Sequence, residues 1–214
     1  MPLTENTRVQ AREIMARYPQ SRSALLPMLH LVQAEEGYVS ADGIALCADE
    51  LALTTAEVAA VATFYTMYHR KPAGEYHIGV CINPGCGILG GDSIWEKLSA
   101  RLGIGHDEVT ADGKVSLERI ECQAACTHAP VMTANWEFLD NMTPESAIEV
   151  VEKLVRGEEV MSTRGPHIRT FKENEFTLAG FDDGLVDFGE SDEQMLAGLK
   201  RAKELGQSAP EAKQ

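Results

Sequence analysis

Residues 76 to 86 read Tyr-His-Ile-Gly-Val-Cys-Ile-Asn-Pro-Gly-Cys, and this stretch decides how the rest of the chain is interpreted. Large apolar side chains alternate with other residues from Tyr76 to Val80, which predicts a β-strand that ends at Cys81. Cys86 follows after four further residues. The strand is therefore expected to deliver two thiols to one edge of a sheet.

A second pair of cysteines, Cys122 and Cys126, follows another stretch with the composition of a strand, around Val115 and Leu117. No cysteine occurs between the two pairs. Two strand ends can bring four thiolates to one point. Such a soft, anionic site suits an iron–sulfur cluster or zinc.

The spacing within the pairs favours a [2Fe-2S] cluster over zinc. Zinc knuckles usually place two residues between their cysteines, whereas these pairs enclose four and three. A [2Fe-2S] cluster contains two irons that each take two thiolates, so it needs two separate pairs. Zinc stays open as an alternative, and so do redox-active dithiols, which the absence of C-x-x-C disfavours.

Glycines at positions 85, 87, 90 and 91 could let the backbone approach inorganic sulfide and donate N–H groups to it. An ordinary flexible turn is an equally good interpretation of Gly90 and Gly91. Residues 85–90 also read G-x-G-x-x-G, but a dinucleotide-binding fingerprint has its first glycine directly after the strand. Here Cys81 to Pro84 intervene, so we reject nucleotide binding by this loop.

The remaining candidate residues have weaker signals. Cys126-Thr127-His128 resembles the start of a Rieske box, but no cysteine follows Cys126, which excludes a Rieske centre. His128 is interpreted as a solvent-facing loop residue, and Cys47, in an apolar helix, as a small buried residue. The other histidines, at positions 30, 69, 77, 106 and 167, are scattered without ligand spacing. Neither a Ser/His/Asp arrangement nor a pair of acid–base carboxylates stands out.

The first seventy residues predict four short helices, which together suggest a small bundle. The first ends before Pro19, Ser23 is expected to cap the second, and the third begins at Ser40. Thr54 and Glu57 form a capping box for the fourth.

After the glycine loop, the apolar pattern predicts a helix over residues 94–102 capped by Asp92, and strands ending at Cys122 and over 131–136. A further helix starts at Pro144 and ends at Gly157. This order predicts an α/β fold, a thioredoxin-like domain behind the helical bundle.

We therefore divide the chain into a helical bundle (1–72), a thioredoxin-like domain (73–158) and an acidic C-terminal extension (159–214). Periodicity is weak over residues 160–190, while a capping box of Ser191 and Gln194 predicts a helix over 192–205. The extension is either disordered alone or an arm that lies on a partner.

The composition excludes several function classes. The chain carries 19 Lys and Arg against 33 Asp and Glu, a net charge of −14, so nucleic acid is not an expected partner. No apolar run approaches the roughly 20 residues of a membrane span. The N-terminus lacks the basic and apolar regions of a signal peptide. We therefore expect a cytoplasmic protein without direct membrane insertion.

Taken together, the motifs resemble the small [2Fe-2S] subunit of NADH:quinone oxidoreductase, respiratory complex I. The similarity is carried by residues 24–30 (ALLPMLH), residues 61–68 (VATFYTMY) and the two cysteine pairs, with Ala129-Pro130 after the second. It covers roughly residues 8 to 158. Residues 135–138 and 143–145 resemble the actinobacterial branch.

The resemblance implies that Cys81 and Cys86 bind one iron, and Cys122 and Cys126 the other. It implies an electron-transfer subunit without catalytic residues, in the peripheral arm on the cytoplasmic face of the inner membrane. The cluster would exchange single electrons with FMN of the adjacent NADH-binding subunit, and the large iron–sulfur subunit would be a further partner.

Two alternatives to this function stay open. The first is the equivalent small subunit of an NAD-linked formate dehydrogenase or hydrogenase. The second belongs to a different class, a zinc-binding interaction module without a redox role. The sequence also departs from many family members, which have Leu-Gly after the third cysteine where this chain has Gln123-Ala124.

Overall fold

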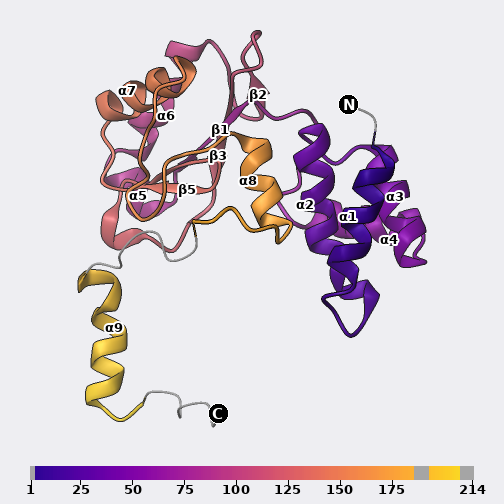
Figure 1. The fold of residues 1–214 in the computed structure, drawn as a ribbon. Helices are drawn as coiled ribbons and strands as arrows, with labels where there is room; N and C mark the ends of the chain where they lie inside the picture. The colour runs from indigo at the N-terminus through magenta and orange to yellow at the C-terminus, as the bar shows by residue number, and fades with distance from the viewer. Residues whose placement is uncertain (1–2, 186–192, 208–214) are drawn as a thin grey trace.

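The structure, a computed structural model, describes residues 3–185 and 193–207, and it consists of a helical bundle followed by an α/β part (Figure 1). The bundle contains α1 (Glu5–Met15), the 3-10 helix η1 (Ser21–Ala24), α2 (Leu25–Glu36), α3 (Ala41–Leu51) and α4 (Thr55–Phe64). The α/β part contains β1 (Tyr76–Cys81), α5 (Pro84–Ile88), α6 (Gly91–Leu102), β2 (Glu108–Val109), β3 (Val115–Ile120), η2 (Cys126–His128), β4 (Met132–Ala134), β5 (Glu137–Leu139) and α7 (Pro144–Val155). Two helices follow, α8 (Phe171–Leu178) and α9 (Glu193–Glu204).

Side-chain caps set where two bundle helices begin. The capping box before α4 is confirmed, because Thr54 accepts a hydrogen bond from the Glu57 N–H and the Glu57 carboxylate accepts one from the Thr54 N–H. Ser40 caps α3 as predicted. The predicted cap at Ser23 is wrong, since this residue lies inside η1 and α2 begins at Leu25 without a side-chain cap.

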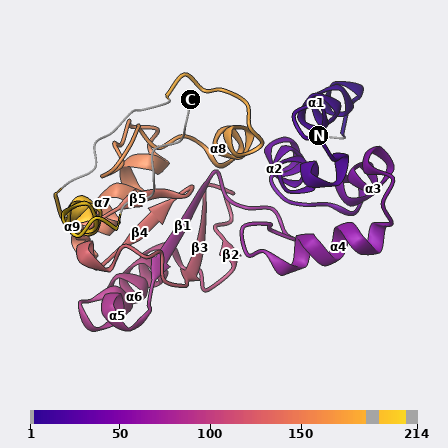
Figure 2. The ribbon, with the colours of Figure 1, turned by 90° about the horizontal axis from the view of Figure 1, so that it is seen from below.

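The sheet has five strands in the order β2-β3-β1-β4-β5, with β1 and β3 parallel and the other pairs antiparallel. The register pairs Cys81 with Ile120. Because parallel strands run in one direction, β1 and β3 end at the same edge of the sheet. Both cysteine-bearing loops therefore start from that edge (Figure 2).

One face of the sheet packs against α6 and α7, and the apolar core lies between them. This core includes Ile78, Val80, Leu117, Ile94, Leu98, Val151 and Leu154. All six residues of β1 are buried, since a central strand is covered on both faces. The alternation that predicted this strand thus marks which face each side chain occupies rather than which side chains reach water.

Several predicted details of the α/β part differ from the structure. The predicted glycine loop contains the short helix α5, and α6 begins at Gly91 without the expected cap from Asp92. The third predicted strand ends at Ala134 because Asn135 and Trp136 adopt positive φ angles of 48° and 73°. The strands β2 and β5 are only two and three residues long, too short for a periodic signal.

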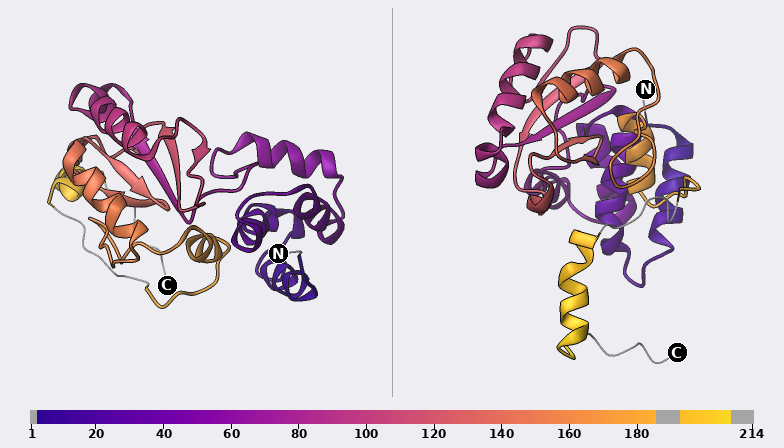
Figure 3. Two further views of the ribbon diagram at one scale, coloured as in Figure 1. Left: turned by 90° about the horizontal axis from the view of Figure 1, so that it is seen from above. Right: turned by 90° about the vertical axis from the view of Figure 1, so that its left-hand side faces the viewer.

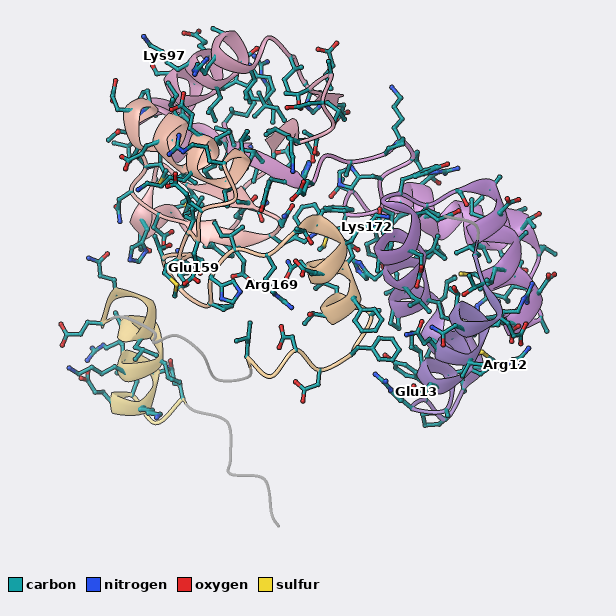
Figure 4. All side chains as sticks on the ribbon, turned by 45° about the horizontal axis from the view of Figure 1, so that its top comes forward. Arg12, Glu13, Lys97, Glu159, Arg169 and Lys172 are labelled. Atoms are coloured by element: carbon teal, nitrogen blue, oxygen red, sulfur yellow. The ribbon has the colours of Figure 1, made fainter. Side chains whose placement is uncertain are left out.

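The first part of the C-terminal extension packs on its own chain. Helix α8 lies against α2 of the bundle and beside the sheet (Figures 1, 2 and 3). Phe171, at its start, is 1% exposed. Lys172 points towards α2 and donates a hydrogen bond of 2.6 Å to the Glu35 carbonyl (Figure 4). Residues 171–178 are therefore neither irregular nor reserved for a partner, as the weak periodicity had suggested.

Glu175 of α8 connects the bundle with the α/β part. Its side chain is fully buried and accepts hydrogen bonds from His30 Nδ1 at 2.6 Å, Gln33 Nε2 at 2.9 Å and Trp136 Nε1 at 2.9 Å. The first two donors belong to α2 and the third to the turn between β4 and β5. One carboxylate thus joins three segments that are distant in sequence.

The last helix is confirmed as α9, within a residue or so of the predicted bounds. It lies apart from the other elements in Figures 1 and 3. Ser191 of the predicted capping box lies outside the described residues. Across residues 3–185 and 193–207, every helix is too short or too polar to cross a bilayer.

Candidate metal centre

The four predicted ligand residues come together at the edge where β1 and β3 end. Cys81 is the last residue of β1, and Cys86 lies in α5. Cys122 follows β3 by two residues, and Cys126 begins η2. Cys81 and Cys86 pack in one small cluster with Ala125, and the Cys126 thiol interacts electrostatically with both of them.

The distance within the second pair is that of metal ligands rather than of a disulfide. The Sγ atoms of Cys122 and Cys126 lie 3.5 Å apart, and both thiols are free. A disulfide would require about 2.05 Å. One tetrahedral metal bound to both sulfurs at about 2.3 Å would hold them about 3.8 Å apart. The side chains can therefore share one ion with only a small adjustment.

The electrostatics of the four thiols fit a cationic occupant. Burial raises the pKa of Cys86 to about 11, and the neighbouring Cys81 adds to the rise. The contact with Cys122 raises the pKa of Cys126. Four thiolates at one place repel one another, and iron or zinc removes this repulsion and favours the deprotonated form.

The two pairs differ in their access to solvent. Cys81 and Cys86 are 1% and 3% exposed, whereas Cys122 and Cys126 lie at the surface. A metal cluster bound by all four would have one buried side and one side that a partner protein can approach.

Gly91 holds the first cysteine loop against α6. A Cβ atom at this position would lie 2.5 Å from the Cys81 carbonyl oxygen and 3.0 Å from that of Cys86. Gly90 has a φ of +120°, a conformation that side chains disfavour. Neither glycine belongs to an ordinary flexible turn, because one is required by close packing and the other by its backbone conformation.

We expect Gly91→Ala to weaken cluster retention, because the added methyl group must push the loop that carries Cys81 and Cys86 away from α6. Gly85→Ala is the matched control in the same loop, since a Cβ there meets nothing within 4 Å. The measurement is the rate of bleaching in the visible spectrum under a chelator, with about 1–3 kcal/mol of destabilisation expected for Gly91→Ala only. Equal bleaching rates for both variants would show that close packing at Gly91 is unimportant.

The second cysteine loop contains a strained residue and a buried histidine. Ala124 has a φ of +56°, at the position where many family members have glycine. The loop thus keeps a left-handed backbone at this point without the residue that adopts it most easily. His128 is 8% exposed, with its Nδ1 atom 2.9 Å from Thr127 Oγ1, so its interpretation as a solvent-facing residue is wrong.

Cys47 is separate from the other cysteines. It is fully buried in the bundle core, and burial raises the pKa of its thiol to about 12. This confirms its prediction as a small buried residue, because a thiol that remains protonated neither binds metal nor reacts.

Known proteins place the chain in a family. The thioredoxin-like [2Fe-2S] ferredoxin family matches residues 11–155. In Mycobacterium tuberculosis (strain H37Rv), the NADH-quinone oxidoreductase subunit designated E is 51% identical over 204 residues, which cover 94% of this chain and 81% of that protein. The chain belongs to the thioredoxin-like [2Fe-2S] ferredoxin family. This confirms the predicted fold class and makes a [2Fe-2S] cluster the cofactor in place of zinc.

More distant relatives agree with this assignment. NADH-quinone oxidoreductase subunit 2 of Thermus thermophilus is 40% identical over 127 residues, covering 58% of this chain and 70% of that protein. Among solved structures, an NAD+-reducing [NiFe]-hydrogenase superimposes with a TM-score of 0.57 at 22% identity. The superposition covers 64% of this chain and only 23% of the hydrogenase chain, so it is a similarity of fold alone.

Proposed function

We propose that Cys81 and Cys86 bind one iron of the [2Fe-2S] cluster, and that Cys122 and Cys126 bind the other. The convergence of two thiol pairs at one sheet edge supports this assignment, as does the 3.5 Å separation of the second pair. When bound, the cluster supplies a site that accepts and returns one electron at a time. The surrounding residues control its exposure to water and to partners.

We infer that the chain is the electron-transfer subunit in the peripheral arm of an NADH:quinone oxidoreductase, exchanging single electrons with FMN of the adjacent NADH-binding subunit. The observation that carries this function is the exposure of the second cysteine pair. Beside the centre, on the helix that contains Cys86, Ile88 is 85% exposed, and the following residue, Leu89, is 61% exposed. An exposed apolar surface next to a redox centre suits a protein partner.

Further partners and the location follow from membership of such a complex. We propose that the large iron–sulfur subunit is a second neighbour, and that the chain lies at the cytoplasmic face of the membrane through its partners. The proposed division into 1–72, 73–158 and 159–214 is kept, with α8 of the third segment packed on the first.

The test combines the cluster-loaded chain with the flavin- and NADH-binding subunit under anaerobic conditions. On addition of NADH, we expect an EPR signal of the reduced cluster only when the flavin subunit is present. Ile88→Glu should slow this reduction, while Val9→Glu, an equal change on α1 at the other end of the molecule, should not (Figure 1). Reduction by NADH alone, or none in the mixture, would contradict the proposal.

The equivalent role in a formate dehydrogenase or hydrogenase is separated by its partners. Affinity purification of the native complex should recover membrane-arm subunits of a quinone reductase. Recovery of a formate- or hydrogen-oxidising subunit instead would assign the chain to the other host complex.

A further inference from the structure

A second group of potential metal ligands lies outside the cysteine centre. His69 follows α4, His77 lies on β1 and Glu118 on β3. One side-chain ligand atom of each lies within 4.8 Å of those of the others. The interpretation of the histidines as scattered is therefore wrong for His69 and His77, because strand pairing brings together residues whose sequence spacing carries no signal.

His69 has a nitrogen that lacks a partner. Its Nε2 atom is sealed from solvent and forms no hydrogen bond. A buried polar atom without a partner lowers stability, so such atoms are rare in folded proteins. Burial, and next the nearby His77, lower the pKa of His69 to about 4. The ring is therefore neutral at pH 7, the form in which imidazole binds metals.

His77 is held with its other nitrogen directed towards the same point. The ring is buried, and its Nδ1 atom lies 3.0 Å from Ser116 Oγ, which also accepts the Gly74 N–H at 3.1 Å. With Nδ1–H donated to Ser116, Nε2 carries the free lone pair. This is the arrangement in which a neighbouring oxygen orients a metal-binding histidine.

Glu118 completes the group with a carboxylate. Its Oε2 atom lies 2.9 Å from His77 Nε2, although the two are not aligned as a hydrogen bond. Burial acts to raise the pKa of Glu118, but the adjacent His77 and His69 outweigh it and the net shift is downward. The side chain is thus an anion that offers a lone pair beside two neutral imidazoles.

We propose that His69, His77 and Glu118 form a binding site for one divalent cation of the zinc class, distinct from the [2Fe-2S] centre. Two imidazoles and one carboxylate are a ligand set for zinc, with a fourth position left for water. A cavity of about 320 Å³ adjoins the three residues and can hold that water. Asp107 lines the same cavity and adds negative charge. The ion would tie the segment after α4 to two strands of the sheet.

The test uses the full-length, tag-free protein with its iron–sulfur cluster in place, so that the cysteines are not available to the added metal. Zinc is titrated by calorimetry at pH 7, and zinc content is measured after dialysis. We expect one zinc ion per chain. Glu118→Gln, which keeps the shape of the side chain, and His69→Phe, which keeps the ring contacts with Trp136 and Phe171, should both abolish this stoichiometric binding.

Two matched changes serve as controls. His167→Phe and Glu159→Gln remove the same chemical groups elsewhere and should retain one zinc ion. Equal binding by all variants, or no binding by the unaltered protein, would overturn the site. If His69→Phe does not fold, Glu118→Gln decides together with anomalous diffraction at the zinc edge. A peak between the three side chains is expected, and a peak only elsewhere refutes the proposal.

Discussion

Replacing Cys122 with serine should remove the [2Fe-2S] cluster while leaving the fold intact. A serine hydroxyl is a hard oxygen donor that stays protonated near neutral pH, so it replaces a soft thiolate poorly. Cys122 lies at the surface, and the substitution therefore leaves the core unchanged. The loss in cluster affinity should exceed the about 10- to 100-fold that follows from removing an outer-shell partner.

The measurements are iron and acid-labile sulfide per chain, the visible spectrum, and EPR after reduction by dithionite. Cys47→Ala is the matched control, since it also removes a thiol but one buried in the helical bundle. It should retain full iron and sulfide, with a stability loss of about 1 kcal/mol from the small cavity. Bleaching by Cys47→Ala but not by Cys122→Ser would show that the ligand assignment is wrong.

Glu175→Ala should be the most destabilising single change outside the metal centre. It removes the acceptor of three buried hydrogen bonds, from His30, Gln33 and Trp136, and leaves these donors without water or partner. Removing one partner of a buried charged pair costs about 3–5 kcal/mol. For a chain of this size we expect the thermal midpoint to fall by about 10 °C or more.

The comparison is made on cluster-loaded protein by circular dichroism at a fixed heating rate. Glu159→Ala removes the same side chain from an exposed position and should change stability by less than about 0.5 kcal/mol (Figure 4). Glu175→Gln keeps the shape and part of the hydrogen bonding, so its midpoint should lie between those of Glu175→Ala and the unaltered protein. If Glu175→Ala unfolds at the same temperature as Glu159→Ala, α8 does not connect the two parts of the chain.

Local signals in the sequence were sufficient for most of the elements. The capping box of Thr54 and Glu57, and the proline at the start of α7, act within a few residues, so they can be read directly. The missed helix α8 has the opposite character. Its buried face includes Asn174 and Glu175, and polar residues at core positions hide the apolar period on which a prediction depends.

The sequence by itself determined the class of the metal centre. Two cysteine pairs, each after a strand, carry their chemistry in residue type and spacing, and both are local properties. Only the tertiary structure decided that Cys81 and Cys86 are buried while Cys122 and Cys126 face solvent. The reason is that exposure depends on what packs over each loop.

The tertiary structure alone also brought Glu175 to α2, and His69 and His77 to Glu118. These contacts join residues up to 145 positions apart in the chain. No periodicity or motif encodes such distances, because they result from strand pairing and from the packing of α8 between the bundle and the sheet.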